Sequence, residues 1–435
     1  MLALEPVVPL VEGLLGVEVP VALLPIVLEV EAPPACGEPA AACVWWCSGP
    51  WVAVAVPVCA VSFISAVSVG MITLLSSRLN CKNGSMGYKG IGGVVGMDGH
   101  RPLRLSVLDQ SPIAEGSTGG DALRNSIDLA RWTDGLGYHR YWVAEHHGTP
   151  MLACASPEVL IGTIAAATSR LRVGSGGVML PHYSPFKVAE AFSMLSGLFP
   201  GRIDLAVGRA PGTDQRTAVA LQRDRRELAP DDFPQQLAEL LAYLGDAMPA
   251  DHPFAELAKT LPGLPERPDP WLLGSSPQSG IWAAEVGLPY AFADFIHAVG
   301  GPIAKRYREQ FQPSEWCKEP RMMVAVSAIC AETDAEAERL AASSRMAISL
   351  LYRGRLIPVP PVETALRFLA EQGGPGLPPG RRAIVGSPSK VREGIEEVAR
   401  EYGAEEVMVV TITWEHAARR RSYELIAREF GLPRA

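Results

Sequence analysis

The main body of the chain has no arrangement of cysteines that would hold a zinc ion or a disulfide framework. Of the eight cysteines, five precede residue 100, and Cys154, Cys317 and Cys330 are scattered through the rest. Cys43 and Cys47 lie four residues apart, but no second pair of ligands accompanies them. We therefore expect the main body to be a reduced, cytoplasmic protein.

Positive charge is scarce, which argues against nucleic acid as a ligand. Lys and Arg number 39 against 47 Asp and Glu, giving a net charge of -8, and no basic cluster is interleaved with aromatics. The short run Arg419–Arg421 falls on an expected helix, where we interpret it as a solvated face.

A Gly-x-Gly-x-x-Gly motif is also missing after the first strand, which argues against a dinucleotide-binding sheet.

Residues 1–96 differ from the rest, and residues 39–77 carry no charge at all. The apolar stretch 51–75 is long enough to span a bilayer as a helix, and basic residues that follow it would leave the main body in the cytoplasm. The alternative is a start codon assigned too far upstream, with Met97 as the natural start. We favour the alternative, because Pro57, Gly70 and several serines make a poor membrane helix. No basic n-region typical of a secretory signal opens the chain.

From Arg101 onwards, apolar runs alternate with amphipathic segments, and we take residues 97–435 as one domain. We expect eight strands in that domain, at Leu103–Leu108, Tyr141–Ala144, Leu171–Leu180, Arg202–Val207, Trp271–Leu273, Tyr290–Phe292, Met322–Cys330 and Glu406–Thr413. Eight such repeats predict an α/β fold of the (β/α)8 TIM barrel type, with a doubly wound sheet as the alternative. A long insertion follows strand four, at 210–270, and the connection 330–406 also exceeds one helix. Both are candidates for loops that cover a site.

In a barrel, polar residues that follow the strands meet at one mouth, and we expect Asp109, after the first strand, among them. Glu145, His146 and His147 follow the second strand, but adjacent histidines on a strand point to opposite faces, so we expect one to face the mouth and no metal to bind. Arg209 and the serines Ser275, Ser276 and Ser279 suit a phosphate, through a cation and amides at a helix N-terminus. The simpler interpretation of Ser275–Ser279 is an N-capping loop.

Glycines within the third expected strand are costly unless something approaches the backbone closely. Gly174, Gly176 and Gly177 all lie there. A flat aromatic cofactor against the strand would explain them, and a β-bulge is the alternative.

Taken together, four stretches resemble the luciferase-like flavin-dependent monooxygenases, the bacterial luciferase superfamily. They are Leu-Asp-Gln-Ser-Pro at 108–112, Ala-Glu-His-His-Gly at 144–148, Arg-Val-Gly-Ser-Gly-Gly-Val-Met-Leu-Pro at 172–181 and Gly-Arg-Ile-Asp-Leu-Ala-Val-Gly-Arg at 201–209. The resemblance runs from about Arg101 to Pro433. It implies a (β/α)8 barrel that binds reduced FMN at its carboxyl face and uses molecular oxygen to oxidise a substrate.

The resemblance also implies roles for individual residues. His146 corresponds to a histidine near the reactive edge of the flavin, and Arg209 to an arginine that binds the flavin phosphate. Ser275, Ser276 and Ser279 fall in the loop that adds phosphate ligands. Gly176-Gly177 matches a non-prolyl cis peptide that supports the flavin ring.

Two departures separate the chain from luciferases proper. Gly208 stands where luciferases carry a reactive cysteine, and Ser275 where they carry an acidic residue, so light emission is not implied. The chain is closer to the single-chain, non-luminescent members. We expect a separate flavin reductase as functional partner and a small molecule as substrate. A monomer and a homodimer both stay open as the oligomeric state. A deazaflavin-dependent hydride-transfer oxidoreductase and a non-catalytic flavin-binding protein are the alternatives.

Overall fold

The structure is a computed structural model that describes residues 102–222, 225, 231–372 and 378–434. The apolar stretch 51–75 and the proposed start at Met97 lie outside these residues. Within the described part of the chain, no helix is both long enough and apolar enough to cross a membrane.

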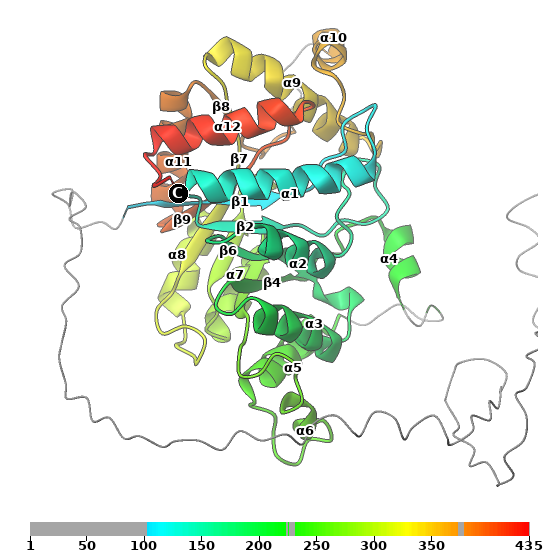
Figure 1. The fold of residues 1–435 in the computed structure, drawn as a ribbon, viewed down its shortest axis with the longest axis vertical. Helices are drawn as coiled ribbons and strands as arrows, with labels where there is room; N and C mark the ends of the chain where they lie inside the picture. Colours follow the sequence, from blue (N-terminus) through cyan, green and yellow to red (C-terminus); the bar gives the residue numbers. More distant parts are fainter. Residues whose placement is uncertain (1–101, 223–224, 226–230, 373–377, 435) are drawn as a thin grey trace, which may run out of the picture. The chain divides into compact units, whose positions relative to one another are not determined.

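Parallel strands form a closed barrel at the centre of the domain (Figure 1). Along the sheet the order is β6-β5-β4-β3-β2-β1-β9-β7, and β6 pairs with β7 to close the ring. The strands of the ring are β1 (Arg104–Asp109), β2 (Arg140–Val143), β3 (Arg172–Met179), β4 (Ile203–Gly208), β5 (Asp269–Gly274), β6 (Tyr290–Ala293), β7 (Met322–Cys330) and β9 (Glu406–Val410). The eight expected strands and the (β/α)8 barrel are therefore confirmed.

One strand was not expected from the sequence. β8 (Ile384–Gly386) lies outside the ring and pairs with the carboxyl end of β7, from Ala328 to Cys330. The last ring strand is also shorter than expected, because Thr411–Thr413 continue beyond β9 without strand pairing.

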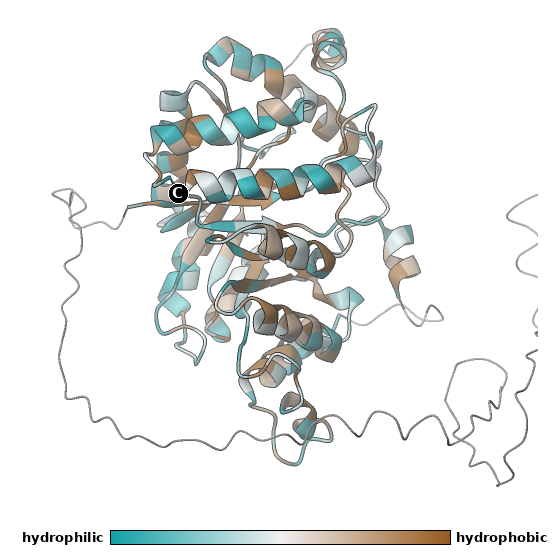
Figure 2. Ribbon diagram, in the orientation of Figure 1, coloured by the Kyte–Doolittle hydropathy of each residue, from teal (hydrophilic) through white to brown (hydrophobic). Residues whose placement is uncertain are grey.

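Helices surround the barrel (Figure 1). They are α1 (Gly119–Leu136), α2 (Pro157–Ala167), α3 (Pro185–Leu198), α4 (Gln215–Leu221), α5 (Phe233–Gly245), α6 (Ala255–Ala258), α7 (Pro277–Glu285), α8 (Gly301–Gln310), α9 (Asp334–Leu351), α10 (Val362–Gln372), α11 (Pro388–Tyr402) and α12 (His416–Glu429), with a 3-10 turn at η2 (Leu180–His182). Teal and brown alternate along α1 and α12 in Figure 2, as expected for helices with one solvated face. The long insertion after β4 contains α4, α5 and α6.

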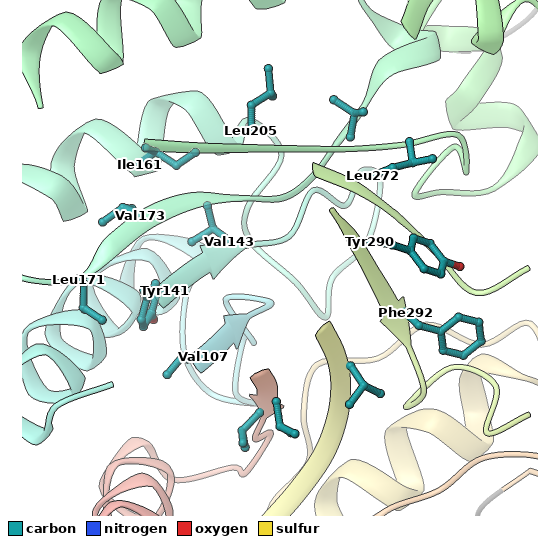
Figure 3. Packing of buried hydrophobic residues seen from close by; sticks show 14 of the residues in the cluster. Val107, Tyr141, Val143, Ile161, Leu171, Val173, Leu205, Leu272, Tyr290 and Phe292 are labelled. Carbon is teal, nitrogen blue, oxygen red and sulfur yellow. The ribbon is translucent and has the colours of Figure 1, made fainter. Parts of the chain in front are cut away.

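Alternation along each strand divides the core into two layers. Val107 and Tyr141 belong to the buried cluster between the strands and the helices, together with helix residues such as Ile161 (Figure 3). Their neighbours Leu108 and Trp142 fill the barrel interior, where the Trp142 ring meets Trp271 edge-on at 5.5 Å between centroids. The interior is therefore packed with side chains, and a ligand must bind at an end of the barrel.

The amino-terminal end of the barrel is closed by buried ion pairs. Arg140 Nη1 donates to Asp204 Oδ2 at 2.7 Å, and Arg140 Nε donates to Glu406 Oε1 at 2.9 Å. Arg172 also donates to Asp204, at 2.6 and 2.8 Å. Burial alone would raise the pKa of Asp204, but Arg140 and Arg172 hold it below its usual value, so the carboxylate stays ionised.

A second buried pair corrects the interpretation of Arg419 as part of a solvated face. The Arg419 guanidinium lies inside the domain and donates to Asp109 Oδ1 at 2.6 Å. Tyr141 Oη donates to the other carboxylate oxygen of Asp109 at 2.5 Å. Asp109, expected among the polar residues of the mouth, is thus fully buried and joins β1 to α12.

Candidate active site

A cavity of about 530 Å³ lies at the carboxyl end of the barrel. Its lining includes Gln110 after β1, His146 and His147 after β2, Thr213 after β4 and Phe295 after β6. Chain segments that follow several strands therefore converge on one space, as they do at the active sites of TIM-barrel enzymes. The volume falls in the range of roughly 300–1,000 Å³ typical of small-molecule sites.

Both histidines of the Glu-His-His triplet line this cavity, which corrects the expectation that only one would do so. β2 ends at Val143, so the alternation of a strand no longer applies at positions 146 and 147. The segment is held by its backbone instead. His146 N donates to Cys154 O at 2.9 Å, and His147 N donates to Gly212 O at 3.3 Å.

His146 carries a buried ring nitrogen that is available for a ligand. Its Nδ1 is shielded from solvent and has no hydrogen-bond partner among the described residues. Burial, and then the neighbouring His147, lower the pKa of His146 to about 4. The imidazole is therefore neutral at pH 7 and can either donate or accept a hydrogen bond at the cavity wall.

This depressed pKa predicts a pH dependence of stability. In the unfolded chain His146 takes up a proton near the ordinary histidine pKa of 6.5, whereas in the fold it does so only near 4, so the unfolded state binds more protons between these values. Stability contributed by the neutral ring is present above about pH 6.5 and is lost as the pH falls towards 4. Between pH 7 and pH 5 the wild type should lose about 1–2 kcal/mol more free energy of unfolding than His146→Gln. Urea unfolding of both proteins at each pH measures this, and equal losses would contradict it.

Glu145 fixes the position of the second histidine. Its carboxylate is buried, with Oε1 at 2.7 Å from His147 Nε2 and Oε2 accepting from Met179 N at 3.0 Å. The His147 ring packs edge-on against His182, whose Nε2 lies 2.8 Å from Pro211 O. The residues that follow β2, β3 and β4 thus form one connected wall of the cavity. Both carboxylate oxygens of Glu145 are engaged by partners in this wall, His147 and Met179. In the described part of the chain no three acidic, histidine or cysteine side chains form a metal site.

The glycines of β3 have a packing explanation. The Gly176-Gly177 peptide is cis, as the resemblance implied, and the β3–β4 register shifts between Gly176 and Val178, as the alternative of a bulge would require. A Cβ at Gly176 would collide with Leu108, and one at Gly177 would come within 2.6 Å of Ala206 O. The backbone of β4 therefore already requires glycine at position 177, the clash at Gly176 is with a side chain, and neither glycine lines the cavity. Contact with a cofactor stays a prediction for both.

Arg209 follows β4, the strand that pairs with β5, and it lies outside the cavity lining. Its guanidinium is half exposed, pairs with both carboxylate oxygens of Asp231, and lies 5.7 Å from the Trp282 ring centroid. Trp282 belongs to α7, the helix that the serine loop precedes. Arg209 therefore contacts the middle of α7, and it follows the strand that pairs with β5, from which the serine loop continues.

Within the serine loop, the N-capping interpretation describes the contacts seen. Ser276 Oγ caps α7 by accepting from Ser279 N at 3.5 Å. Ser279 Oγ donates to Ser276 O at 2.8 Å and lies 2.8 Å from Tyr290 Oη. Ser275 is half-buried and Ser276 is exposed. Phosphate binding by this loop stays a prediction.

A closed parallel barrel with an interior packed by side chains, and a cavity at its mouth lined by a partly buried histidine, is the arrangement of a TIM-barrel enzyme. Residues 103–406 match the family described as luciferase-like monooxygenase, and the chain belongs to that family. The resemblance to its single-chain, non-luminescent members is thereby confirmed, and the protein is an oxidoreductase.

Three similar proteins illustrate the match. A protein of Escherichia coli (strain K12) named luciferase-like monooxygenase is 41% identical over 328 residues, covering 75% of this chain and 96% of that protein. N-acetyl-S-alkylcysteine monooxygenase of Bacillus subtilis (strain 168) is 36% identical over 331 residues, covering 75% and 97%. The crystal structure of apo-MsnO8 is 41% identical with a TM-score of 0.70, covering 77% of this chain and 99% of that one.

Proposed function

We propose that this protein is a flavin-dependent monooxygenase that uses reduced FMN and molecular oxygen to oxidise a small organic substrate. The observation that carries the proposal is the buried, unpartnered Nδ1 of His146 at the wall of the mouth cavity. A buried polar atom without a partner is costly, so its presence in a cavity favours a ligand that hydrogen-bonds there. The membership of the monooxygenase family gives that ligand its identity.

The described residues fit such a cofactor. Arg209 and the amides at the start of α7 would hold the phosphate, and the Gly176-Gly177 segment would support the ring. His146, neutral at pH 7, would hold or move a proton at its Nδ1. When bound, reduced flavin supplies the electrons with which oxygen is activated. The apolar side chains of the cavity would exclude bulk water from the reacting groups.

A separate flavin reductase would supply the reduced cofactor, because the sequence carries no nicotinamide-binding fingerprint. A relative named N-acetyl-S-alkylcysteine monooxygenase supports a small organic molecule as substrate. Deazaflavin-dependent hydride transfer is the alternative: barrels of this fold include one solved in complex with FMN and one with an F420-acetone adduct. Both are under 25% identical to this chain. They support the idea that this fold can bind either cofactor, and they do not favour one cofactor over the other.

Cofactor binding tests the proposal directly. The purified protein is titrated without oxygen with reduced FMN and, separately, with reduced deazaflavin, and any co-purified cofactor is identified by absorbance and mass. Tighter binding of reduced FMN, followed by substrate-dependent oxygen uptake, is expected. Preference for the deazaflavin would favour the hydride-transfer alternative. FMN binding without turnover of any thioether, ketone or aldehyde offered would favour a flavin-binding protein.

Arg209→Gln should weaken FMN binding by roughly tenfold to hundredfold, because a charge-assisted contact to phosphate is lost. Riboflavin, which has no phosphate, should bind both proteins equally. Asp231→Asn is the complementary variant. It removes the carboxylate that pairs with Arg209, so it should tighten FMN binding. The measurement is quenching of flavin fluorescence on titration. Equal FMN affinity in wild type and Arg209→Gln would place the phosphate elsewhere.

A further inference from the structure

The cavity extends beyond the barrel mouth to a second wall built by α9. Ala341, Ser344, Arg345 and Ile348 all line it, and their spacing of three and four residues places them on one face of that helix. Ala383 and Val385, around β8, complete this wall. The second wall is therefore mostly apolar, with one guanidinium set into it.

Arg345 is a partly buried cation, and one of its N–H donors has no hydrogen-bond acceptor in the described part of the chain. Its side chain is 14% exposed, and Nη1 donates to Glu338 Oε2 at 2.5 Å. Its Nε is buried and has no hydrogen-bond partner among the residues that the structure describes. A charged donor left unpaired beside apolar side chains is costly, and an acceptor entering the cavity would remove that cost.

The other charged residues of the lining leave a positive balance. Arg381 donates to Tyr352 Oη at 3.1 Å, and no carboxylate of the described chain lies within ion-pair distance of it. Arg382, by contrast, pairs with Glu401 at 2.8 Å. The one lining carboxylate among the described residues is Asp214, which is exposed and caps α4 by accepting from Thr217 N at 2.9 Å.

We propose that the substrate is a small apolar molecule with an anionic group, a carboxylate in the simplest case, and that Arg345 binds this group with Arg381 at the rim. This inference rests on the proposed function, since it assigns the second wall to the substrate. The flavin phosphate does not compete for Arg345, because its proposed site follows β4 and β5, whereas Arg345 lies on the helix after β7. The apolar part of the substrate then faces the barrel mouth and His146.

Octanoate and 1-octanol provide matched probes, because they share an alkyl chain and differ in charge. Isothermal titration calorimetry of the full chain should give octanoate an affinity roughly tenfold to hundredfold above that of octanol. Arg345→Gln should abolish this difference, and Arg345→Lys should keep part of it. Glu338→Gln should tighten octanoate binding, because it frees Nη1 of Arg345. Arg367→Gln, at an exposed arginine of α10 that does not line the cavity, is the control and should change neither affinity.

Three results would overturn the inference. Equal affinity for the two probes would show that charge is not recognised, and an unchanged preference in Arg345→Gln would move recognition elsewhere. Competition between saturating FMN and octanoate would assign the anion site to the cofactor phosphate. Octanoate binding is measured without cofactor as well, so a failure to bind FMN would contradict the proposed function while leaving the anion site intact.

Discussion

Replacing Arg140 with methionine should lower the free energy of unfolding by about 3–5 kcal/mol. The Arg140 guanidinium is 2% exposed and joins β2 to Asp204 on β4 and Glu406 on β9, while its Cζ lies 5.0 Å from the Trp271 ring centroid. Methionine fills much of the same volume but leaves both carboxylates without their central cation. Most of the lost free energy of unfolding therefore comes from buried charge without a partner, and less comes from the cavity. Urea unfolding followed by tryptophan fluorescence measures it.

Arg124→Met provides the comparison. Arg124 also pairs with a carboxylate, Asp121 at 2.6 Å, but its side chain is 71% exposed on α1. Water solvates both charges of that pair when it is broken, so the expected change is under about 1 kcal/mol. Trp142 Nε1 also donates to Asp204 Oδ2, at 2.9 Å. A similar small change in Arg140→Met would mean that Arg172 and Trp142 alone satisfy Asp204, and that the buried network contributes little to stability.

The barrel could be predicted from the sequence because its strands are buried on both faces. Such strands appear as continuous apolar runs, and Tyr141–Ala144 and Met322–Cys330 were recognisable for that reason. β8 escaped because Ile384–Gly386 is three residues long and follows a Gly/Pro-rich stretch. A run that short has no periodicity of its own. Its strand character comes from pairing with β7, which no local pattern encodes.

Partners far apart in the chain explain the errors at the mouth. A polar residue after a strand shows where the side chain lies, but it does not show whether another residue already pairs with it. Asp109 therefore looked like a site residue. Its partner Arg419 lies 310 positions later and looked like part of an exposed basic run. The two errors share one cause, because each residue neutralises the charge of the other and so allows both to be buried. Arg345 was missed for a related reason: an arginine within a helix is usually solvated, and only the packing of α9 turns it into the cavity.

His146→Ala should reduce kcat by roughly 10²- to 10⁴-fold, the contribution typical of a positioned proton donor or acceptor. FMN affinity should fall by much less, because the proposed phosphate contacts of Arg209 are unaffected. His252→Ala is the matched control, since His252 lies away from the cavity lining. Steady-state oxygen uptake with FMN and substrate gives kcat, and flavin titration gives the affinity. If both fell together, His146 would serve to bind the cofactor and not to move a proton.

The pH profile separates a chemical role of His146 from a structural one. Because burial and His147 lower the pKa of this ring to about 4, its neutral form persists well below the usual range for histidine. If the neutral form is the active one, kcat/KM of the free enzyme should stay flat from about pH 8 down to about pH 5 and fall as the pH approaches 4. His147→Asn removes the neighbouring imidazole that adds to the lowering of the His146 pKa, so the acid limb should move to higher pH. An acid limb near 6.5 in the wild type, unmoved in His147→Asn, would mean that another group controls the rate.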